Sequence, residues 1–269
     1  MTDSRRVRRW RVARAGVAVL VLGLTSRPAL ANALHDILAA GVVRIAVPED
    51  LPPFGAKDKD GKLEGYDVEV AKLLAKGLGV RVALVPVTSV DRITSLLTHS
   101  ADLVVANLGI TPDRAKGIAF SSPYAPFFTA VFGAPGVVVQ APADLDGRKV
   151  AVTRDTVEDH ELTRLAPPGT DIMRFDSNSA ALDAFFFGRT ELLATGNVVV
   201  AAALKAHPDK QIEEKFRITE SPAGIGVPRG EADLLNWVNV FVFHSKLNGD
   251  LDRLSRQWLG GRLPPLPAL

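Results

Sequence analysis

The sequence contains no cysteine in its 269 residues. That absence excludes disulfide bonds, thiol catalysis and metal sites built on cysteine. Without covalent cross-links a stable fold depends on a hydrophobic core. A chain of this length with 47% hydrophobic residues can bury one large core or two smaller ones.

Metal-ligand and cofactor motifs are also missing. His160-Glu161 has no second histidine four residues further on, and no other histidine pair has metal-ligand spacing. The chain has neither a glycine-rich phosphate loop nor a Gly-x-Ser-x-Gly nucleophile elbow. The sequence therefore predicts no metal, no cofactor and no catalytic nucleophile.

The start of the chain has the composition of a secretion signal. Six arginines precede residue 15, and the apolar stretch Ala15 to Leu24 is too short to span a bilayer. Ala29-Leu30-Ala31 is a small-x-small cleavage site. We predict a signal peptide of residues 1–31 and export to the periplasm. A cut after Ala33 and an uncleaved membrane anchor stay open as alternatives.

Removing the signal reverses the sign of the net charge. Residues 1–31 hold seven arginines and one aspartate, a net +6, and subtracting this from the +2 of the whole chain leaves −4. The basic character of the full sequence therefore belongs to the signal. The remaining chain gives no reason to expect nucleic-acid binding.

Apolar runs alternate with amphipathic segments along the rest of the chain. Val42 to Val47, Val80 to Val85 and Leu103 to Ala106 have the pattern of buried strands, with helices predicted between them. A second cycle of the same kind begins near Val137. We predict an α/β fold with parallel strands, in two lobes with a ligand cleft between them.

One run combines several features of an anion site. Thr111 is a suitable N-cap, Pro112 fits the first turn of a helix, and Arg114 falls on that turn. Backbone N–H groups at a helix start, together with a guanidinium, can hold both oxygens of a carboxylate. The alternative is an ordinary arginine that pairs with a nearby acid.

From about Gly41 to Gly260 the chain resembles the periplasmic solute-binding proteins of polar amino-acid ABC importers, the bacterial extracellular solute-binding protein family 3. The segments that carry this resemblance are Asp50-Leu51-Pro52-Pro53-Phe54, Gly61 to Ala71, Ile110-Thr111-Pro112-Asp113-Arg114-Ala115-Lys116, Phe120-Ser121-Ser122-Pro123-Tyr124, Asp144 to Val152 and Leu251 to Gly260.

The resemblance implies the type II fold, with two lobes that are each a sheet flanked by helices. Lobe 1 would comprise residues 34–125 and 222–269, and lobe 2 residues 126–221. Two crossover strands, near Tyr124–Phe128 and Pro222–Gly226, would join the lobes and act as the hinge for closure.

The resemblance also assigns the acid-binding half of the cleft. Arg114 would hold the α-carboxylate of the ligand, and the backbone around Asn107, Gly109 and Thr111 would add N–H donors. Thr156 would close on the ligand from lobe 2. For Thr156 the alternative is a plain N-cap, and both roles can hold together.

The remaining candidate residues concern ligand choice. Arg92 is similar to an arginine that reaches a second carboxylate in some acidic-ligand binders, although a solvated helix face is the alternative. Asn197 stands where the family usually has an aspartate that pairs with the α-ammonium, so Glu49 or Asp50 would have to supply that charge. Leu51 replaces an aromatic that stacks on the ligand, with Phe54 as a nearby substitute or a core residue.

The function implied by the resemblance is capture of a polar, possibly acidic, amino acid and its delivery to an ABC transporter permease in the inner membrane. The protein would act as a monomer and not as an enzyme. Two alternatives stay open: a periplasmic dehydratase-like enzyme acting on a cyclic carboxylic acid, and a receptor that only signals.

Overall fold

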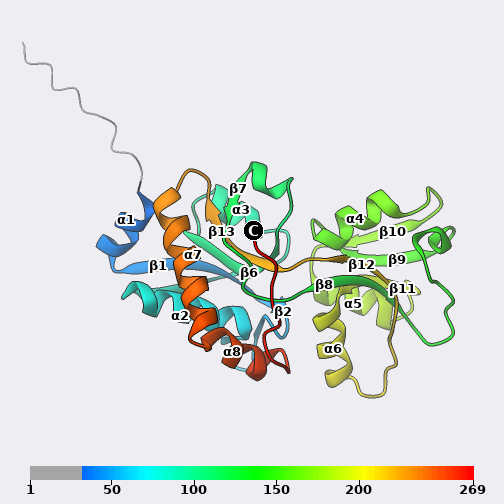
Figure 1. The fold of residues 1–269 in the computed structure, drawn as a ribbon. Coiled ribbons are helices and arrows are strands. Elements are labelled where there is room, and N and C mark those ends of the chain that lie inside the picture. Colours follow the sequence, from blue (N-terminus) through cyan, green and yellow to red (C-terminus); the bar gives the residue numbers. More distant parts are fainter. Residues whose placement is uncertain (1–31) are drawn as a thin grey trace, which may run out of the picture. The chain divides into compact units, whose positions relative to one another are not determined.

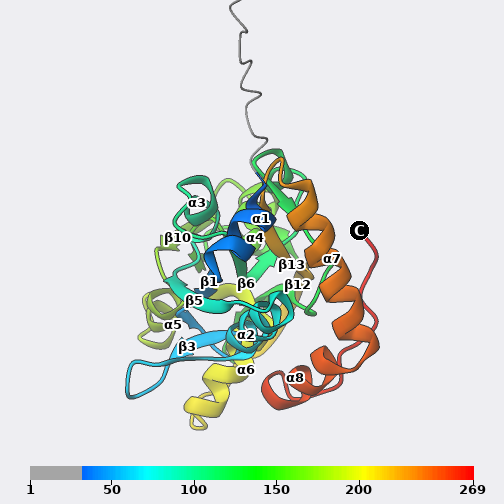
Figure 2. The same cartoon turned by 90° about the vertical axis from the view of Figure 1, so that its left-hand side faces the viewer.

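The computed structural model describes residues 32–269, and the predicted signal peptide lies outside this range (Figure 1). Within the described part, no helix is both long enough and apolar enough to cross a membrane. Two five-stranded mixed sheets, each flanked by helices, organise the chain (Figures 1 and 2). We call each sheet with its helices a lobe.

The sheet of the first lobe has the strand order β5-β1-β6-β13-β7. Its strands are β1 (Val42–Pro48), β5 (Arg81–Val87), β6 (Leu103–Gly109), β7 (Ile118–Phe120) and β13 (Ala223–Pro228). β5, β1 and β6 are parallel, whereas β13 runs antiparallel to both of its neighbours. All seven residues of the central strand β6 are buried, as expected for a strand covered on both faces.

The helices of the first lobe are α1 (Ala33–Ala40), α2 (Tyr66–Leu78), α3 (Arg92–Leu97), α7 (Ala232–Leu247) and α8 (Asp250–Trp258). α2 begins at Tyr66 with Gly65 as its N-cap, two residues before Asp67, whose residue type also suits an N-cap. Gly65 has a φ of +134°, and a Cβ there would overlap the carbonyl of Phe54. This position needs glycine, which fixes the start of α2 two residues earlier.

The second lobe has the strand order β10-β9-β11-β8-β12. Its elements are β8 (Phe128–Gly133), β9 (Lys149–Thr153), α4 (Val157–Leu165), β10 (Asp171–Phe175), α5 (Asn178–Phe186), β11 (Leu192–Gly196), α6 (Asn197–Ala206) and β12 (Glu213–Glu220). A separate small sheet, formed by β2 (Asp50–Leu51), β3 (Gly55–Lys57) and β4 (Leu63–Glu64), precedes α2.

The chain passes between the two sheets twice, after β7 and after β12, and these two segments pair with each other. Ala125 and Ala223 form an antiparallel bridge. The Tyr124 N–H donates to the Ala223 carbonyl at 2.8 Å, and the Ser221 N–H donates to the Phe127 carbonyl at 2.8 Å. The two passages therefore form one hydrogen-bonded ribbon between the lobes.

The helix predicted after Thr111 is much shorter than expected. Only a single 3₁₀ turn, η1 (Arg114–Lys116), forms before β7 begins at Ile118. Too few residues separate the two strands for an α-helix, whose nucleation is costly. The anion site predicted here consequently lacks a full helix N-terminus, and its backbone donors must be judged one at a time.

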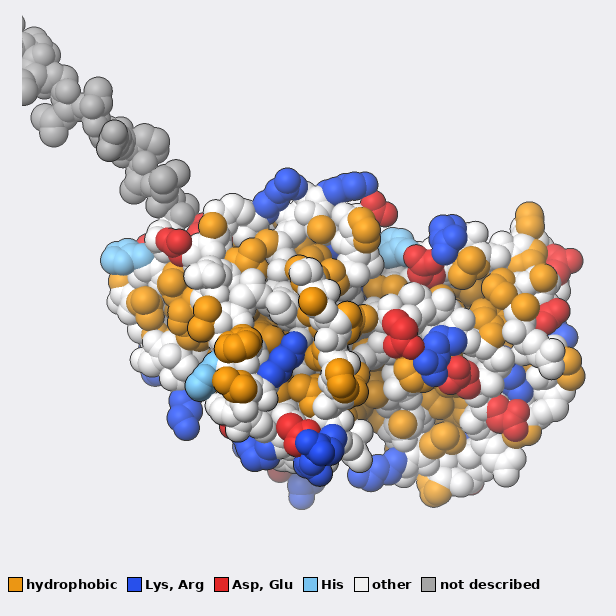
Figure 3. Space-filling model, in the orientation of Figure 1, with side chains coloured by type: hydrophobic (Ala, Val, Ile, Leu, Met, Phe, Trp, Pro, Cys, Tyr) orange, Lys and Arg blue, Asp and Glu red, His pale blue; other side chains and the backbone are white. Residues whose placement is uncertain are grey.

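Acidic and basic side chains are interspersed over the face shown in Figure 3, where neither sign forms an extended patch. This mixed surface agrees with the small net charge calculated for the chain without its first 31 residues.

Candidate functional site

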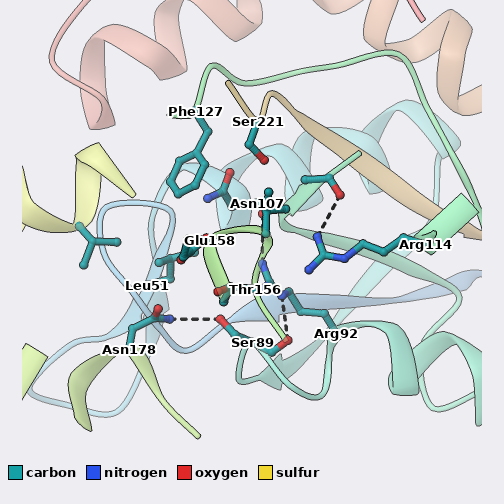
Figure 4. Close-up of a pocket in the computed structure, with 13 residues that line it drawn as sticks. Leu51, Ser89, Arg92, Asn107, Arg114, Phe127, Thr156, Glu158, Asn178 and Ser221 are labelled. Atoms are coloured by element: carbon teal, nitrogen blue, oxygen red, sulfur yellow. Dashed lines mark hydrogen bonds between the residues drawn. The ribbon is translucent and has the colours of Figure 1, made fainter. Parts of the chain in front are cut away.

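A polar cavity lies between the two lobes and beside the ribbon that joins them (Figure 4). Its volume is about 20 Å³, close to the space that one water molecule needs. The residues that line it are Leu51, Ser89, Arg92, Asn107, Gly109 and Arg114 from the first lobe, Phe127 and Ser221 from the ribbon, and Thr156, Val157, Glu158, Asn178 and Val199 from the second lobe.

Arg114 reaches from the first lobe to the second. Its Nη1 donates to the Gly109 carbonyl at 3.0 Å, and its Nη2 donates to the Asp155 carbonyl at 2.6 Å. Burial, with a smaller contribution from Arg92, lowers the pKa of Arg114 to about 10, so the guanidinium stays protonated at neutral pH. The cavity therefore holds a fixed, largely desolvated positive charge, which suits a carboxylate.

Arg92 is 5% exposed and is committed to the backbone. Its Nε donates to the Ser89 carbonyl at 3.0 Å, and its Nη1 donates to the carbonyls of Ala106 and Asn107, each at 3.1 Å. These bonds fasten the end of β6 to the loop before α3. The predicted alternative of a solvated helix face is therefore wrong, because the side chain is buried against the cavity.

Asn107 occupies a strained position at the cavity wall. It has a φ of +43°, and its N–H donates to the Tyr124 hydroxyl at 3.2 Å. That N–H is thus already engaged, which is a correction to its predicted part as a ligand donor. The side chain lines the cavity instead, and its buried Oδ1 has no hydrogen-bond partner within the described residues.

A buried polar network lies behind Asn107. The Tyr124 hydroxyl donates to Asp67 Oδ1 at 2.6 Å, and the Tyr66 hydroxyl donates to the Tyr124 carbonyl at 2.9 Å. Asp67 is fully buried, and this desolvation raises its pKa to about 7. The network connects the cavity wall to the start of the ribbon between the lobes.

The second lobe presents the start of α4 to the cavity. Thr156 is the N-cap: its Oγ1 accepts from the Asp159 N–H at 3.3 Å and donates to the Thr153 carbonyl at 2.7 Å. The predicted capping role of Thr156 is confirmed by this geometry. The Thr156 hydroxyl already donates one hydrogen bond and accepts another. The adjoining backbone N–H groups are therefore the better donors for a ligand.

Glu158 is an acid in the cavity that sequence reasoning missed. It is the second residue of α4 and is 5% exposed. Burial raises its pKa, opposed by its own N–H and by the charges of Arg92 and Arg114. Its position two residues after Thr156 was the available signal, because a helix start that faces a cleft also places the residues of its first turn near that cleft.

Asp50 lies beside the cavity rather than in its wall. Its carboxylate accepts the Asn178 N–H at 2.8 Å and so meets the start of α5 in the other lobe. Asn178 also donates from Nδ2 to Ser89 Oγ at 3.2 Å and accepts from Thr153 Oγ1 at 3.0 Å. These contacts form a second link between the lobes. Of the residues in this link, the sequence predicted only Asp50 as a site residue.

Two further predicted residues lie outside the cavity. Thr111 lines a different, surface cavity beside Pro112, although its Oγ1 accepts the Arg114 N–H at 3.2 Å. Asn197 Oδ1 accepts the Phe128 N–H at 3.3 Å, and its side chain adjoins the end of α8. Leu51 does line the cavity, whereas Phe54 is fully buried in the core.

Gly196, the N-cap of α6, shows why no side chain from this helix start reaches the cavity. A Cβ at this position would overlap the ring of Phe127. The phenyl ring, which lines the cavity, thus fills the space that a side chain at position 196 would take. The second lobe therefore offers no acid from the start of α6.

Comparison with known proteins gives consistent matches over most of the chain. The family described as bacterial extracellular solute-binding proteins, family 3, matches residues 43–261. The L-cystine-binding protein of Escherichia coli strain K12 is 27% identical over 234 residues, which cover 84% of this chain and 86% of that protein.

Solved structures match equally well. An ancestral arginine-binding protein bound to arginine superposes with a TM-score of 0.78 at 31% identity, covering 82% of this chain and 99% of its own. The solute receptor for L-cysteine of Neisseria gonorrhoeae has a TM-score of 0.78 at 32% identity, covering 84% and 93%.

These matches confirm the predicted type II two-lobed fold. The proteins are named for binding and not for catalysis, which confirms the prediction of a binding protein rather than an enzyme. The chain belongs to the bacterial extracellular solute-binding proteins, family 3.

Proposed function

We propose that this protein captures a polar α-amino acid between its lobes, at the site of this cavity, and delivers it to an ABC importer. The cavity has the volume of about one water molecule, so the lobes would have to move apart to admit the ligand. The observation that carries the proposal is Arg114, a partly buried guanidinium that opens on a cavity lined from both lobes. Some relatives are named for cystine, cysteine or arginine. These three ligands all carry the carboxylate and ammonium groups common to α-amino acids.

The ligand carboxylate would bind Arg114 by replacing the Asp155 carbonyl, and backbone N–H groups at the start of α4 would assist from the other lobe. Leu51, Phe127, Val157 and Val199 supply the apolar part of the wall. Because Arg92 already donates to three carbonyls, a second carboxylate on the ligand has less to bind than the sequence suggested. We therefore propose a polar rather than an acidic preference.

The test is a thermal-shift screen with the protein amino acids, L-cystine, dicarboxylates and cyclic carboxylic acids, followed by calorimetry. A ligand that binds only the native state raises the melting temperature. We expect at least one neutral or basic α-amino acid to do so. A response limited to dicarboxylates or cyclic acids would contradict the proposal.

The Arg114→Ala variant tests the site itself. Removing one partner of a desolvated charge pair costs about 2–5 kcal/mol, so we expect affinity to fall by roughly thirtyfold or more. Arg164→Ala is the matched control, because Arg164 pairs with Glu161 on the surface of α4. Near-normal affinity in Arg114→Ala would refute the assignment.

Delivery to a permease is a separate part of the proposal. In the source bacterium, deleting this protein should abolish high-affinity uptake of the radiolabelled ligand, and Arg114→Ala should not restore it. Unchanged uptake would favour a signalling role. Periplasmic location, as the signal sequence predicts, would be checked by fractionation of the same strain.

A further inference from the structure

We infer that Glu158 binds the α-ammonium group of the ligand. This inference rests on the proposed function and deepens it, because it names the residue that distinguishes an amino acid from a plain carboxylic acid. The carboxylate belongs to α4 and adjoins the same cavity as Arg114 (Figure 4).

The environment of Glu158 calls for a cation. The residue is 95% buried, and no nitrogen of a lysine, arginine or histidine in residues 32–269 forms an ion pair with it within 4.0 Å. Arg92 and Arg114 lie near enough to attract the charge but donate to carbonyls instead. The Glu158 carboxylate has its own N–H and the Thr156 side chain as hydrogen-bond partners but no ionic partner in the described residues. A buried carboxylate without an ionic partner is costly, and an ammonium group would supply that partner.

Other acids near the cavity are already engaged or do not reach it. Asp50 accepts from Asn178, and Asp67 is fully buried and accepts from Tyr124. Glu158 is the single acid in the cavity wall. The start of α6 carries Gly196, whose side-chain space is filled by Phe127, and then Asn197, which contacts Phe128.

Position within the lobe also fits the assignment. Arg114 approaches from the first lobe, and Glu158 approaches from the second. A ligand held by its carboxylate on one side and its ammonium on the other would bridge the lobes. The two charged groups of one amino acid would then stabilise closure of the cleft.

The experiment compares each amino acid with the analogue that lacks its α-ammonium group, or both such groups for L-cystine. The probes are L-arginine and 5-guanidinopentanoate, L-cysteine and 3-mercaptopropanoate, and L-cystine and 3,3′-dithiodipropanoate. Calorimetry measures each pair against wild type, Glu158→Gln and Glu161→Gln. Glu161 lies on the same helix, pairs with Arg164 and does not line the cavity, so it controls for the loss of one charge.

We expect wild type to bind the amino member of at least one pair more tightly. In Glu158→Gln that amino acid should bind about ten- to a hundredfold more weakly, in line with a lost hydrogen bond between charged groups. The partner without the amino group should keep its affinity within about threefold. Glu161→Gln should behave as wild type.

Three results would overturn the inference. One is equal weakening of both members of a pair in Glu158→Gln, which indicates a structural role. Another is equal strengthening of both, which indicates that Glu158 only offsets the charges of Arg92 and Arg114. The third is the absence of binding by all six probes in wild type. Near-normal binding in Arg114→Ala would refute the proposed function and leaves the Glu158 comparison untouched, so the two failures are distinguishable.

Discussion

Asp67 is a fully buried acid, so its environment differs strongly from that in the unfolded chain. Its Oδ1 accepts from the Tyr124 hydroxyl, whereas its Oδ2 is buried without a partner in the described residues. Burial raises the pKa to about 7. Since Tyr124 also accepts the N–H of Asn107, this acid supports the cavity wall from behind.

That shift predicts a pH dependence of stability. An acid with a raised folded-state pKa stabilises the fold fully below its unfolded pKa of about 3.9, and this contribution is lost as the pH rises through about 7. Asp67→Asn cannot ionise. We therefore expect the melting temperature of wild type, relative to Asp67→Asn, to decrease between about pH 4 and pH 7 and to level off above about pH 7.

Asp209→Asn, an exposed loop substitution, controls for the loss of one carboxylate. Thermal unfolding at four pH values measures the effect. Parallel curves for wild type and Asp67→Asn would contradict the assignment of a raised pKa to Asp67.

At this same scale, Arg114 could be identified from the sequence but Glu158 could not. Arg114 follows a strand within a recognisable run, so its neighbours along the chain define its surroundings. Glu158 owes its importance to Arg92, Arg114 and Phe127, which are distant in sequence. Asn197 was expected in the cleft but lies outside the cavity. The local sequence gave no sign that the ring of Phe127 lies over Gly196 at this helix start.

Among the elements, β6 and α4 approach each other at the cavity. The approach depends on Gly109, the last residue of β6. A Cβ at this position would lie 2.7 Å from Val157 Cγ2, at the start of α4, and would overlap Ser221 Oγ. The absence of a side chain thus allows the strand end and the helix start to meet.

Gly109→Ala is expected to keep these elements apart and so weaken ligand binding by about fivefold or more, in line with the cost of overpacking of about 1–3 kcal/mol. Gly117→Ala is the control, because a Cβ there would meet nothing nearer than 3.8 Å. Calorimetry with the ligand found in the screen provides the measurement. Equal affinities for the two variants would show that β6 and α4 do not need to approach this closely.

The sequence predicts elements well where apolar runs are long. The strands near Val42, Val80 and Leu103 all form as expected. Prediction fails at η1, where Thr111 and Pro112 have the residue types of a helix start. The distance along the chain to β7, rather than local propensity, limits that segment to one turn.

For the whole molecule, the link between Asp50 and Asn178 joins the lobes separately from the ribbon. Such a contact favours the conformation in which the lobes are together. It should therefore contribute to apparent affinity without touching the ligand, because binding selects the closed arrangement.

Asp50→Ala is expected to weaken binding by a few fold and to increase the radius of gyration measured by small-angle X-ray scattering without ligand. Asp50→Asn, which retains an oxygen that can accept the Asn178 N–H, should have a smaller effect. An unchanged radius of gyration in Asp50→Ala would mean that the ribbon alone sets the separation of the lobes.

The contact between Arg114 and the Asp155 carbonyl gives ligand entry the character of a substitution reaction. The backbone carbonyl of Asp155 would compete with the ligand carboxylate for the Arg114 guanidinium. Measured affinity is then the difference between two bonds to the same group, and the carbonyl sets a threshold that every incoming carboxylate has to exceed. Under the proposed function, an anion that bonds Arg114 more weakly than this carbonyl would not displace it.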